Sequence, residues 1–362
     1  MRVTIDATSA LVRSAGVKNY TYYWIAHLRR QAARGEEIRA YPFLPDDFGR
    51  LDHEASVLPM WATIPRLAAL HAVNRFGPRA LDFVLRDSDI FHASNLVHHA
   101  PSRARLTATV HDLTAFFTPE VHTVGNVRAD HVFAERILKR AHGLIAVSEH
   151  TRQDTIRLLK IPPERITTIH SGVPETFFDA VPVGRERPFV LYVGTIEPRK
   201  NLETLLDGWK QLKPSLRGEF ELVFVGPVGW SAETTFARIR AEATYLGYVP
   251  EADLSGLVAG AAAFVYPSLY EGFGFPVVQA MAAGTPVITS NVSCLPEIAG
   301  DAALLKIDPR STAELTGAIC RILQSETLRA DLISRGRVRA QRYRWENCAE
   351  QSLEFFRKIA SD

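Results

Sequence analysis

Cysteine is scarce in this 362-residue chain, which has only Cys294, Cys320 and Cys348. Their wide spacing fits neither a disulfide framework nor a metal-ligand pattern. Long hydrophobic runs are lacking too, because the most apolar stretch, residues 257–266, is far too short to span a bilayer. The chain enters a predicted strand at Arg2, so we expect no signal peptide. Together these features predict a soluble protein of the reducing cytoplasm.

A strong charge of either sign is also lacking, since 42 Lys and Arg accompany 40 Asp and Glu. The distribution is uneven: residues 1–172 carry 22 Lys and Arg, 17 Asp and Glu, and all 12 histidines. This bias is either compositional drift or a surface for an anionic partner or membrane. Residues 60–86, where arginines alternate with apolar residues, are either helices packed on a sheet or a basic amphipathic face for lipid. Peripheral contact with the inner membrane surface therefore stays an alternative, and no nucleic-acid partner is expected.

The chain does have the length and composition of a two-domain globular protein, with 46% hydrophobic and 23% charged residues and no obvious repeat. Predicted strands and helices alternate along it, which is typical of α/β proteins with parallel sheets. We predict an N-terminal domain over residues 1–175 and a C-terminal domain over residues 188–341. A linker is predicted at residues 176–187, where composition loosens, and a terminal helix within residues 342–362.

The most informative stretch is a strand, a glycine loop, a helix and a second strand. An apolar run at residues 262–266 predicts the first strand, and residues 286–289 predict the second. Free N–H groups at the start of the helix, around Gly274 and Phe275, form an anion site reinforced by the helix dipole. Glu271 at the mouth of the loop would repel a phosphate, so we expect it to accept hydrogen bonds from ligand hydroxyls. A phosphate and a polyol together indicate a sugar nucleotide.

The segments EGFGFP (residues 271–276), QAMA (279–282) and GTPV (284–287) resemble the signature of the large retaining glycosyltransferase family 4, which has the GT-B fold. The resemblance implies two Rossmann-like, doubly wound parallel-sheet domains that face each other across a cleft. It also implies that the terminal helix, residues 342–362, crosses back to the N-terminal domain. The resemblance covers nearly the whole chain and is most specific over residues 189–287.

In that family, a pair of glutamates separated by seven residues marks the donor site. The first resembles Glu271, which the resemblance assigns to the donor sugar. The second position holds Gln279, which is a departure from the family pattern. An amide oxygen can still accept a hydrogen bond from a ribose hydroxyl, but the charge-assisted bond is lost. The departure bears on donor affinity more than on the chemistry.

A second segment, TIEPRKN at residues 195–201, resembles the family's Arg-Lys-Asn step. Two cations at a helix start oppose the helix dipole, so Arg199 and Lys200 are either an ordinary solvated pair or partners of an anion. The resemblance implies that they clamp the donor diphosphate and stabilise the leaving group. We therefore predict no metal. The Asp-x-Asp motif at residues 87–89 precedes a strand, away from the strand ends where ligands bind, and is not expected to hold one.

Other positions complete the predicted site. His111 ends a predicted strand, where an open parallel sheet presents its ligand crevice; a surface histidine is the alternative. It resembles the family's His-Asp step near the donor sugar, with Asp112 either orienting the imidazole or capping a helix. The resemblance also implies that Gly16 faces the donor diphosphate and that backbone groups around Val249 bind the nucleobase. The histidine pair at residues 98–99 lines the acceptor loop at most.

The reaction that the resemblance implies is retaining transfer of a hexosyl group, with mannosyl and GDP-mannose favoured. The acceptor is expected to be a glycan, lipid-linked or other molecule of polysaccharide or glycoconjugate synthesis. We expect no cofactor and a front-face path in which the leaving phosphate accepts the acceptor's proton. A GT-B sugar-nucleotide epimerase and, because of Gln279, a non-catalytic nucleotide-sugar-binding protein are the alternatives. A phosphorylase would need a much longer chain. The sequence leaves the oligomeric state open.

Overall fold

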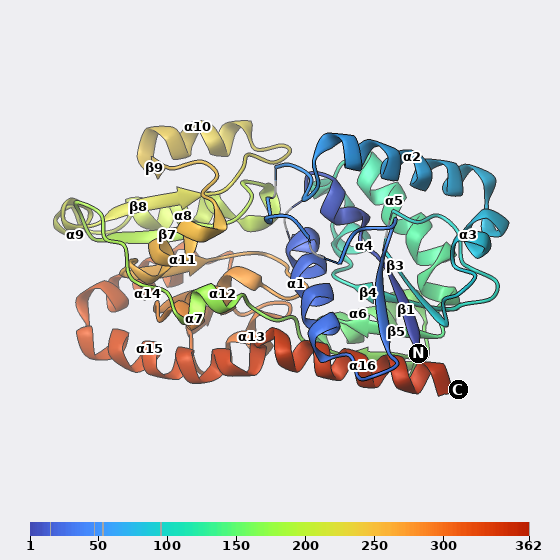
Figure 1. Cartoon of the computed structure of the whole chain (residues 1–362). Helices are drawn as coiled ribbons and strands as arrows, with labels where there is room; N and C mark the ends of the chain where they lie inside the picture. The colour runs from blue at the N-terminus through green and yellow to red at the C-terminus, as the bar shows by residue number, and fades with distance from the viewer. Residues whose placement is uncertain (15, 47, 53, 95, 362) are drawn as a thin grey trace. The chain divides into compact units, whose positions relative to one another are not determined.

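The structure is a computed structural model that describes residues 1–14, 16–46, 48–52, 54–94 and 96–361, without the side chains of residues 121 and 304–307. The chain divides into two compact units, coloured by residue number in Figure 1. Unit 1 comprises Met1–Pro119, Val124–Gly172 and Trp345–Asp362, and unit 2 comprises Glu120–Thr123 and Val173–Arg344.

In the described part of the chain, unit 1 is built on a six-stranded parallel sheet of order β2-β1-β3-β4-β5-β6. Its strands are β1 (Arg2–Asp6), β2 (Glu37–Tyr41), β3 (Ile90–Ala93), β4 (Arg105–Val110), β5 (Gly143–Ala146) and β6 (Ile166–Thr168). Its helices are α1 (Gly16–Gln31), α2 (Met60–Phe76), α3 (Pro78–Val84), α4 (Thr114–Phe117), α5 (Val124–Arg136), α6 (Glu149–Leu159) and α16 (Trp345–Ser361).

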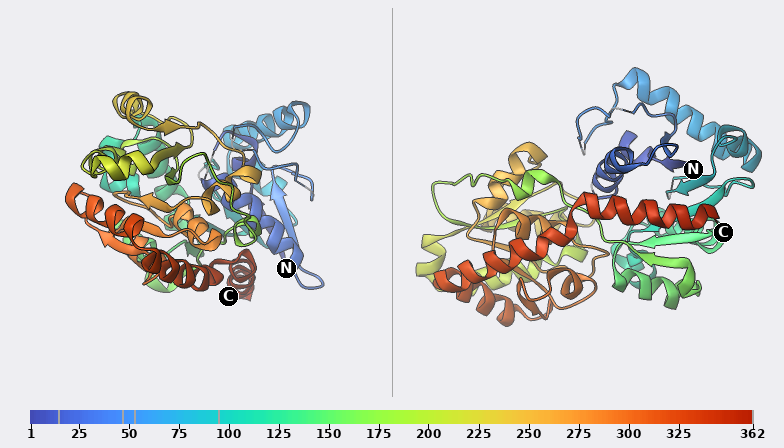
Figure 2. Two further views of the ribbon diagram at one scale, coloured as in Figure 1. Left: turned by 90° about the vertical axis from the view of Figure 1, so that its left-hand side faces the viewer. Right: turned by 60° about the horizontal axis from the view of Figure 1, so that its bottom comes forward.

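Helices cover both faces of the unit 1 sheet, as buried parallel strands require. Phe91 and His92 are neighbours on β3 and therefore point to opposite faces. Phe91 belongs to a core cluster with Leu81 of α3, whereas His92 contacts aromatic side chains of α1 and α16. Helix α16 lies against this second face, and a Cβ added to Gly143 would come within 2.6 Å of Ile359 Cδ1 (Figure 2). A glycine at the start of β5 thus allows the terminal helix to approach the sheet.

Unit 2 repeats the plan, with a six-stranded parallel sheet of order β12-β11-β10-β7-β8-β9 among its described residues. Its strands are β7 (Phe189–Val193), β8 (Glu221–Val225), β9 (Thr244–Tyr245), β10 (Ala263–Tyr266), β11 (Val287–Ser290) and β12 (Leu304–Ile307). Its helices are α7 (Glu175–Phe178), α8 (Leu202–Lys210), α9 (Pro214–Glu219), α10 (Glu233–Glu242), α11 (Glu251–Ala259), α12 (Phe275–Ala283), α13 (Leu295–Ala299), α14 (Thr312–Gln324) and α15 (Glu326–Ala340).

The predicted fold class, two doubly wound parallel-sheet α/β domains, is confirmed. Residues 60–86, where helices were expected without bounds, form the two helices α2 and α3. Helix α2 ends at Phe76 because Gly77 takes a left-handed φ of 82°, and Pro78 then begins α3. Helix α10 was not predicted. None of the helices in the described residues is long and apolar enough to cross a membrane.

The strand order locates a ligand crevice in each unit. In an open parallel sheet, ligands bind outside the carboxyl ends of the strands, where the strand order reverses. In unit 1 this point lies beside β1, between β1 and β3. In unit 2 it lies beside β7, between β7 and β10. The loops that follow β7 and β10 carry the segments singled out from the sequence.

Candidate functional site

The loop after β7 is held against the end of β10 by its own backbone geometry and one amide side chain. A short 3-10 helix, η5 (Pro198–Lys200), ends at Asn201, which has a left-handed φ of 59°. Asn201 Nδ2 donates to the carbonyl oxygens of Pro267 at 3.1 Å and Pro309 at 2.5 Å. This arrangement directs the side chains of η5 toward the loop that follows β10.

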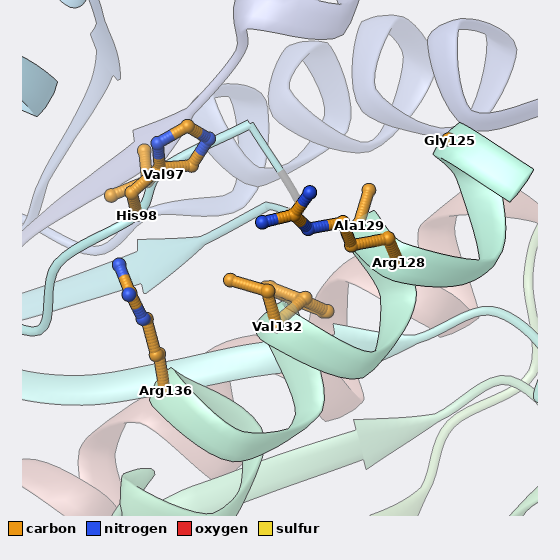
Figure 3. A pocket seen from close by; sticks show the side chains of 8 residues that line it. Val97, His98, Gly125, Arg128, Ala129, Val132 and Arg136 are labelled. Carbon is orange, nitrogen blue, oxygen red and sulfur yellow. The ribbon is translucent and has the colours of Figure 1, made fainter.

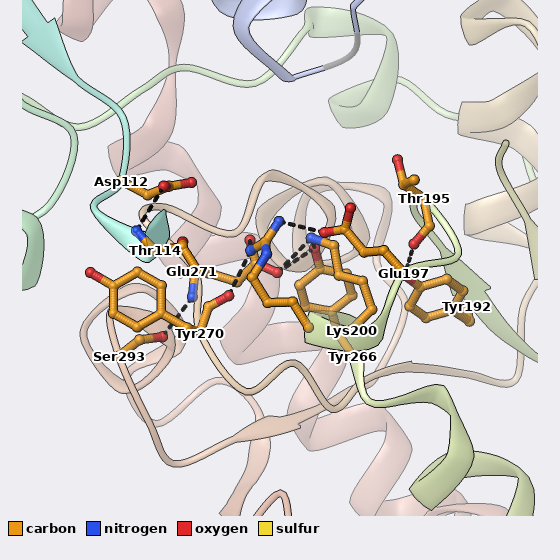
Figure 4. A network of polar contacts seen from close by, with 11 residues as sticks. Asp112, Thr114, Tyr192, Thr195, Glu197, Lys200, Tyr266, Tyr270, Glu271 and Ser293 are labelled. Carbon is orange, nitrogen blue, oxygen red and sulfur yellow. Dashed lines mark hydrogen bonds and ion pairs between the residues drawn. The ribbon is translucent and has the colours of Figure 1, made fainter. Parts of the chain in front are cut away.

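The carboxylate of Glu271 lies between the two cations of η5 (Figure 4). Glu271 Oε1 is 2.6 Å from Lys200 Nζ, and Oε2 is 2.9 Å from Arg199 Nη1. The hydroxyl of Tyr266, the last residue of β10, donates to Glu271 Oε1 at 2.9 Å and accepts from Lys200 Nζ at 2.8 Å. The backbone N–H of Glu271 donates to Ser293 Oγ at 3.0 Å. The carboxylate is therefore held by both cations and by a hydroxyl.

A second carboxylate holds the far side of Arg199. Arg199 Nη2 is 2.8 Å from Glu197 Oε1, and Arg199 Nη1 also donates to the carbonyl oxygen of Tyr270 at 2.6 Å. With Lys200 and Glu271 the network has two positive and two negative charges. The sequence left the adjacent cations either as a solvated pair or as partners of an anion, and in this structure both are paired with Glu271. We call these four charged residues, Glu197, Arg199, Lys200 and Glu271, the switch-point network.

Burial and charge act in opposite directions on the members of this network. Burial would raise the pKa of Glu271, but the adjacent charges of Arg199 and Lys200 outweigh it and lower the pKa to about 2. Burial, followed by the positive charge of Arg199, lowers the pKa of Lys200 although Glu271 opposes this change. Nearby positive charge lowers both pKa values. The Glu271 carboxylate is next to two positive charges, and the Lys200 ammonium is next to the positive charge of Arg199. Glu271 is thus firmly ionised at neutral pH.

Helix α12 begins at Phe275, four residues after Glu271. Gly274 takes a left-handed φ of 84°, which favours glycine, and a Cβ there would come within 2.9 Å of the Leu295 Cδ2 methyl group, which would have to shift. Phe275 is the first helical residue, as the predicted anion site needs. Gln279 lies one turn further along and is 8% exposed. Val249 lies in the segment between β9 and α11 and is half-buried.

The remaining predicted residues belong to unit 1. His111 directly follows β4, and its ring packs edge-on against Tyr20 of α1 with centroids 4.8 Å apart. Burial lowers the pKa of His111 to about 4, and the charge of Asp112 opposes this shift. Asp112 Oδ1 accepts from the backbone N–H of Thr114 at 3.1 Å, which is the capping alternative. Gly16 begins α1, and a Cβ there would meet no described atom within 4 Å.

A buried carboxyl group at the unit 1 switch point was not predicted. Asp6, the last residue of β1, is 3% exposed. It accepts hydrogen bonds from the backbone N–H and hydroxyl of Thr8 and from the hydroxyl of Ser94. Burial raises the pKa of Asp6, and these hydrogen bonds offset only part of the rise. This group therefore lies among neutral donors, unlike Glu271.

Sequence reasoning also missed members of the switch-point network and its surroundings. Glu197 precedes Arg199 by two residues in the same motif, so its role could have been inferred from that spacing. Tyr266 ends a predicted strand beside the glycine loop, which is a weaker signal. Ser293 lies in no recognisable motif, and only the folded chain brings it to the backbone N–H of Glu271. In the described residues, no group of three or more His, Cys, Asp and Glu side chains could hold a metal ion.

The structure brings three predicted residues, Arg199, Lys200 and Glu271, into direct contact in unit 2. Gly274 and Phe275 begin the helix that follows them. The other predicted residues are placed separately: Gln279 in α12, Val249 before α11, and His111 and Gly16 in unit 1. The arrangement of unit 2 offers two cations and a helix N-terminus to an anion, with a carboxylate beside them for hydroxyl groups.

Comparison with known proteins accounts for nearly the whole chain. The family model "Glycosyl transferases group 1" matches residues 174–339, and the model "Glycosyltransferase Family 4" matches residues 14–177. The chain is 34% identical over 308 residues to O-antigen chain mannosyltransferase B of Escherichia coli, covering 80% of each chain. It is 29% identical over 312 residues to MMP alpha-(1->4)-mannosyltransferase of Mycolicibacterium hassiacum, covering 81% of this chain and 75% of that one.

Among solved structures, sucrose-phosphate synthase from Thermosynechococcus elongatus is similar with a TM-score of 0.75 and 21% identity, over 99% of each chain. At that identity the likeness shows the fold alone. The two family models and the 34% identical relative show more, because together they span both units. The chain belongs to the glycosyl transferases group 1 and family 4 glycosyltransferases.

Proposed function

We propose that this glycosyltransferase moves a mannosyl group from GDP-mannose to a glycan or lipid-linked acceptor, with retention of the anomeric configuration and without a metal ion. The observation that carries the proposal is the switch-point network at the carboxyl ends of β7 and β10. The mannosyl assignment is supported by the names of the relatives, O-antigen chain mannosyltransferase B and MMP alpha-(1->4)-mannosyltransferase.

The cations of the network suit the diphosphate of the donor. Arg199 and Lys200 can stabilise the charge that develops on a nucleoside-diphosphate leaving group, and the N-terminus of α12 adds its dipole. In this structure Glu271 is paired with both cations, which offsets the repulsion between the two like charges. When the diphosphate binds, it shares these cations, and the carboxylate of Glu271 becomes available to the hydroxyl groups of the sugar.

The transfer needs only groups of this chain and of the substrates. The bond between the anomeric carbon and the donor phosphate breaks, and the nucleoside diphosphate leaves with the electron pair. The acceptor oxygen bonds to the same face of the sugar, and its proton passes to the departing phosphate oxygen. His111 and Gly16 of unit 1 are proposed to contact the donor sugar and diphosphate, and backbone groups around Val249 to contact the base.

A donor panel tests this proposal. The protein is incubated with GDP-mannose, GDP-fucose, UDP-glucose and ADP-glucose, each with and without a mannose-containing acceptor, and release of nucleoside diphosphate is followed. Release from GDP-mannose that requires or is accelerated by the acceptor is expected, with the α-anomer as product. Faster release from another donor would contradict the mannosyl assignment, and a β-linked product would contradict retention.

A non-catalytic nucleotide-sugar-binding protein is the second candidate, and Gln279 favours it. The residue is 8% exposed on α12, where the family pattern has a carboxylate. The same panel separates the candidates, because a binding protein raises its melting temperature with a donor but releases no nucleoside diphosphate.

A peripheral place on an anionic membrane is proposed for unit 1. Three large apolar side chains of α2, Met60, Trp61 and Ile64, are 68%, 80% and 57% exposed at one end of the helix. Trp and apolar side chains of this kind insert at the headgroup boundary, and the arginines of α2 and α3 suit anionic lipid. Sedimentation with vesicles tests this: binding to phosphatidylglycerol vesicles is expected, with loss in Trp61→Ala. Equal binding by that variant would contradict the assignment.

A further inference from the structure

A pocket of roughly 230 Å³ lies in unit 1 (Figure 3). It is formed by one face of α5 and by the segment that follows β3. Arg128, Val132 and Arg136 recur every four residues along α5 and therefore lie on one face of the helix. His98 closes the opposite side. The volume is below the roughly 300–1,000 Å³ of sites for drug-sized ligands, so the pocket suits one end of a ligand.

The basic side chains of this pocket converge without a carboxylate. In Figure 3 the guanidinium groups of Arg128 and Arg136 and the imidazole of His98 face a common space. Within the described residues, no ion pair or hydrogen bond is formed by the side chain of Arg128 or Arg136. Burial, and then the positive charges of His99 and Arg136, lower the pKa of His98. Two arginines thus lie at this pocket without a carboxylate partner among the described residues.

The two carboxyl groups of α5 belong to Asp130 and Glu135. Glu135 lies 2.5 Å from Lys139 Nζ in an ion pair of its own. Asp130 is half-buried, and burial together with the charge of Asp112 raises its pKa to about 6. Neither side chain lines the pocket. An anion from outside the chain would therefore be the partner of the two arginines.

The floor of the pocket is apolar. Val97, Val132 and Phe133 line it beside the basic groups. An inorganic anion has no carbon atoms to contact this apolar surface. A phosphate ester does, because methylene or ring carbons lie next to its phosphate. Two guanidinium groups match the charge of a phosphate monoester, about −1.5 to −2 at neutral pH, and arginine pairs with phosphate oxygens in a bidentate manner.

We propose that this pocket binds a phosphate ester group of the acceptor, with Arg128 and Arg136 contacting the phosphate oxygens and His98 donating a further hydrogen bond. The proposal rests on the proposed function, because it names the class of acceptor that the glycosyltransferase uses. The phosphate belongs either to a soluble sugar phosphate or to the (di)phosphate that links a glycan to a lipid carrier. Val132 and Phe133 contact the carbon atoms that carry the phosphate.

Binding to the full-length protein tests the proposal. Calorimetry is run with mannose 1-phosphate and, in detergent micelles, with a prenyl diphosphate, both with excess GDP present to fill the donor site. The wild type is compared with the double variant Arg128→Gln/Arg136→Gln and with Arg140→Gln, an exposed arginine of the same unit outside the pocket. We expect at least tenfold weaker binding of one or both ligands by the double variant and unchanged binding by Arg140→Gln.

The two ligands distinguish the sources of the phosphate. A loss confined to mannose 1-phosphate identifies a soluble acceptor, and a loss confined to the prenyl diphosphate identifies a lipid-linked one. Equal affinity of the wild type and the double variant for both ligands would overturn the proposal. Misfolding does not obscure the result, because removing two unpartnered like charges should leave the melting temperature unchanged or higher.

Failure of this inference is distinguishable from failure of the proposed function. Hydrolysis of GDP-mannose without acceptor uses only the donor site, so its rate should be the same in the wild type and the double variant. If the double variant still hydrolyses GDP-mannose and binds both phosphate ligands as tightly as the wild type, the pocket assignment is wrong and the glycosyltransferase assignment stands. If the wild type releases no nucleoside diphosphate from any donor, with or without an acceptor, the proposed function is wrong, whatever the pocket binds.

Discussion

The two switch points of this protein have the same topology and opposite electrostatics. In unit 1, the buried carboxyl group of Asp6 is surrounded by hydroxyls, and its pKa is raised. In unit 2, the buried carboxylate of Glu271 lies between Arg199 and Lys200, and its pKa is lowered to about 2. The strand order therefore determines where each crevice lies. The residues of the loop after β7 determine whether charged side chains line it. In the described residues, the buried carboxylate of the unit 2 crevice is paired with two cations, whereas that of the unit 1 crevice accepts from hydroxyls and a backbone N–H.

The largest expected effect follows from removing the carboxylate of unit 2. Glu271→Gln should lower donor turnover by roughly 100-fold, on the scale of about 2–3 kcal/mol for losing a charged contact in a dry site. It should also destabilise the fold by about 3 kcal/mol at neutral pH, because both cations lose their shared partner. Turnover is measured by release of nucleoside diphosphate, and stability by denaturant unfolding. Glu219→Gln, an exposed change in the same unit, is the matched control.

Turnover of Glu271→Gln within a few-fold of the wild type would contradict the role of the carboxylate at the sugar. Loss of turnover with unchanged stability would contradict its role as counterion of Arg199 and Lys200.

The pH dependence of stability should have opposite signs at the two switch points. The pKa of Glu271 falls from an ordinary 4.5 to about 2 on folding, so its contribution is present above pH 4.5 and lost as pH falls toward 2. The pKa of Asp6 rises above its ordinary 3.8, so its contribution is present below pH 3.8 and is lost as pH rises. Glu271→Gln should thus cost most at neutral pH, and Asp6→Asn should cost least there.

Denaturant unfolding of the wild type and both variants from pH 3 to pH 7 measures these slopes. Asn is a fitting replacement for Asp6, since its amide oxygen can accept from Thr8 and its amide N–H can donate to the hydroxyl of Ser94. Parallel slopes for the two variants would mean that the crevices do not differ in charge as described.

A smaller effect is expected at position 279. Gln279→Glu restores the carboxylate of the family pattern, and donor affinity should rise by about 1 kcal/mol because a charged acceptor bonds ribose hydroxyls more strongly. Turnover should change less. Calorimetry with GDP-mannose measures the affinity, with Gln211→Glu as an exposed control. Unchanged or weaker binding would show that position 279 does not contact the ribose.

The smallest effect is expected at Gly16. A Cβ there meets no described atom within 4 Å, and the residue begins a regular helix, so Gly16→Ala should leave the melting temperature unchanged. Any loss of donor affinity in that variant would then report a contact with the donor. Unchanged affinity would remove Gly16 from the proposed site.

Much of the fold could be predicted from the sequence because its signals are local. The buried run of β7 and the strand, glycine loop and helix at residues 262–290 read directly from hydrophobic pattern and from the positions of glycine and proline. The start of α6 is equally local, because Ser148 is its N-cap and accepts from the backbone N–H of Thr151 at 3.0 Å. Helix α10 was missed because its buried face is narrow, with Ile239 as its one fully buried residue in the described structure.

The candidate site was predicted only in part, for a physical reason. Arg199, Lys200 and Glu271 carry the motifs, but 71 residues separate Lys200 from Glu271, and their ion pair depends on the strand order of the sheet. The sequence left Arg199 and Lys200 either as a solvated pair or as partners of an anion, whereas the structure pairs both with a carboxylate of the same chain. Asp6 was missed for a similar reason, since its partner Ser94 is 88 residues away.

The central claim is that the switch-point network stabilises the leaving diphosphate without a metal ion. It is tested most directly by the rate of nucleoside-diphosphate release from GDP-mannose in excess EDTA, for the wild type, Arg199→Ala, Lys200→Ala and the exposed control Arg240→Ala. We predict that EDTA leaves the wild-type rate unchanged and that each network variant loses about 100-fold or more, on the scale of a preorganised charge-stabilising group. Loss of the wild-type rate in EDTA, or full rates in both network variants, would contradict the claim.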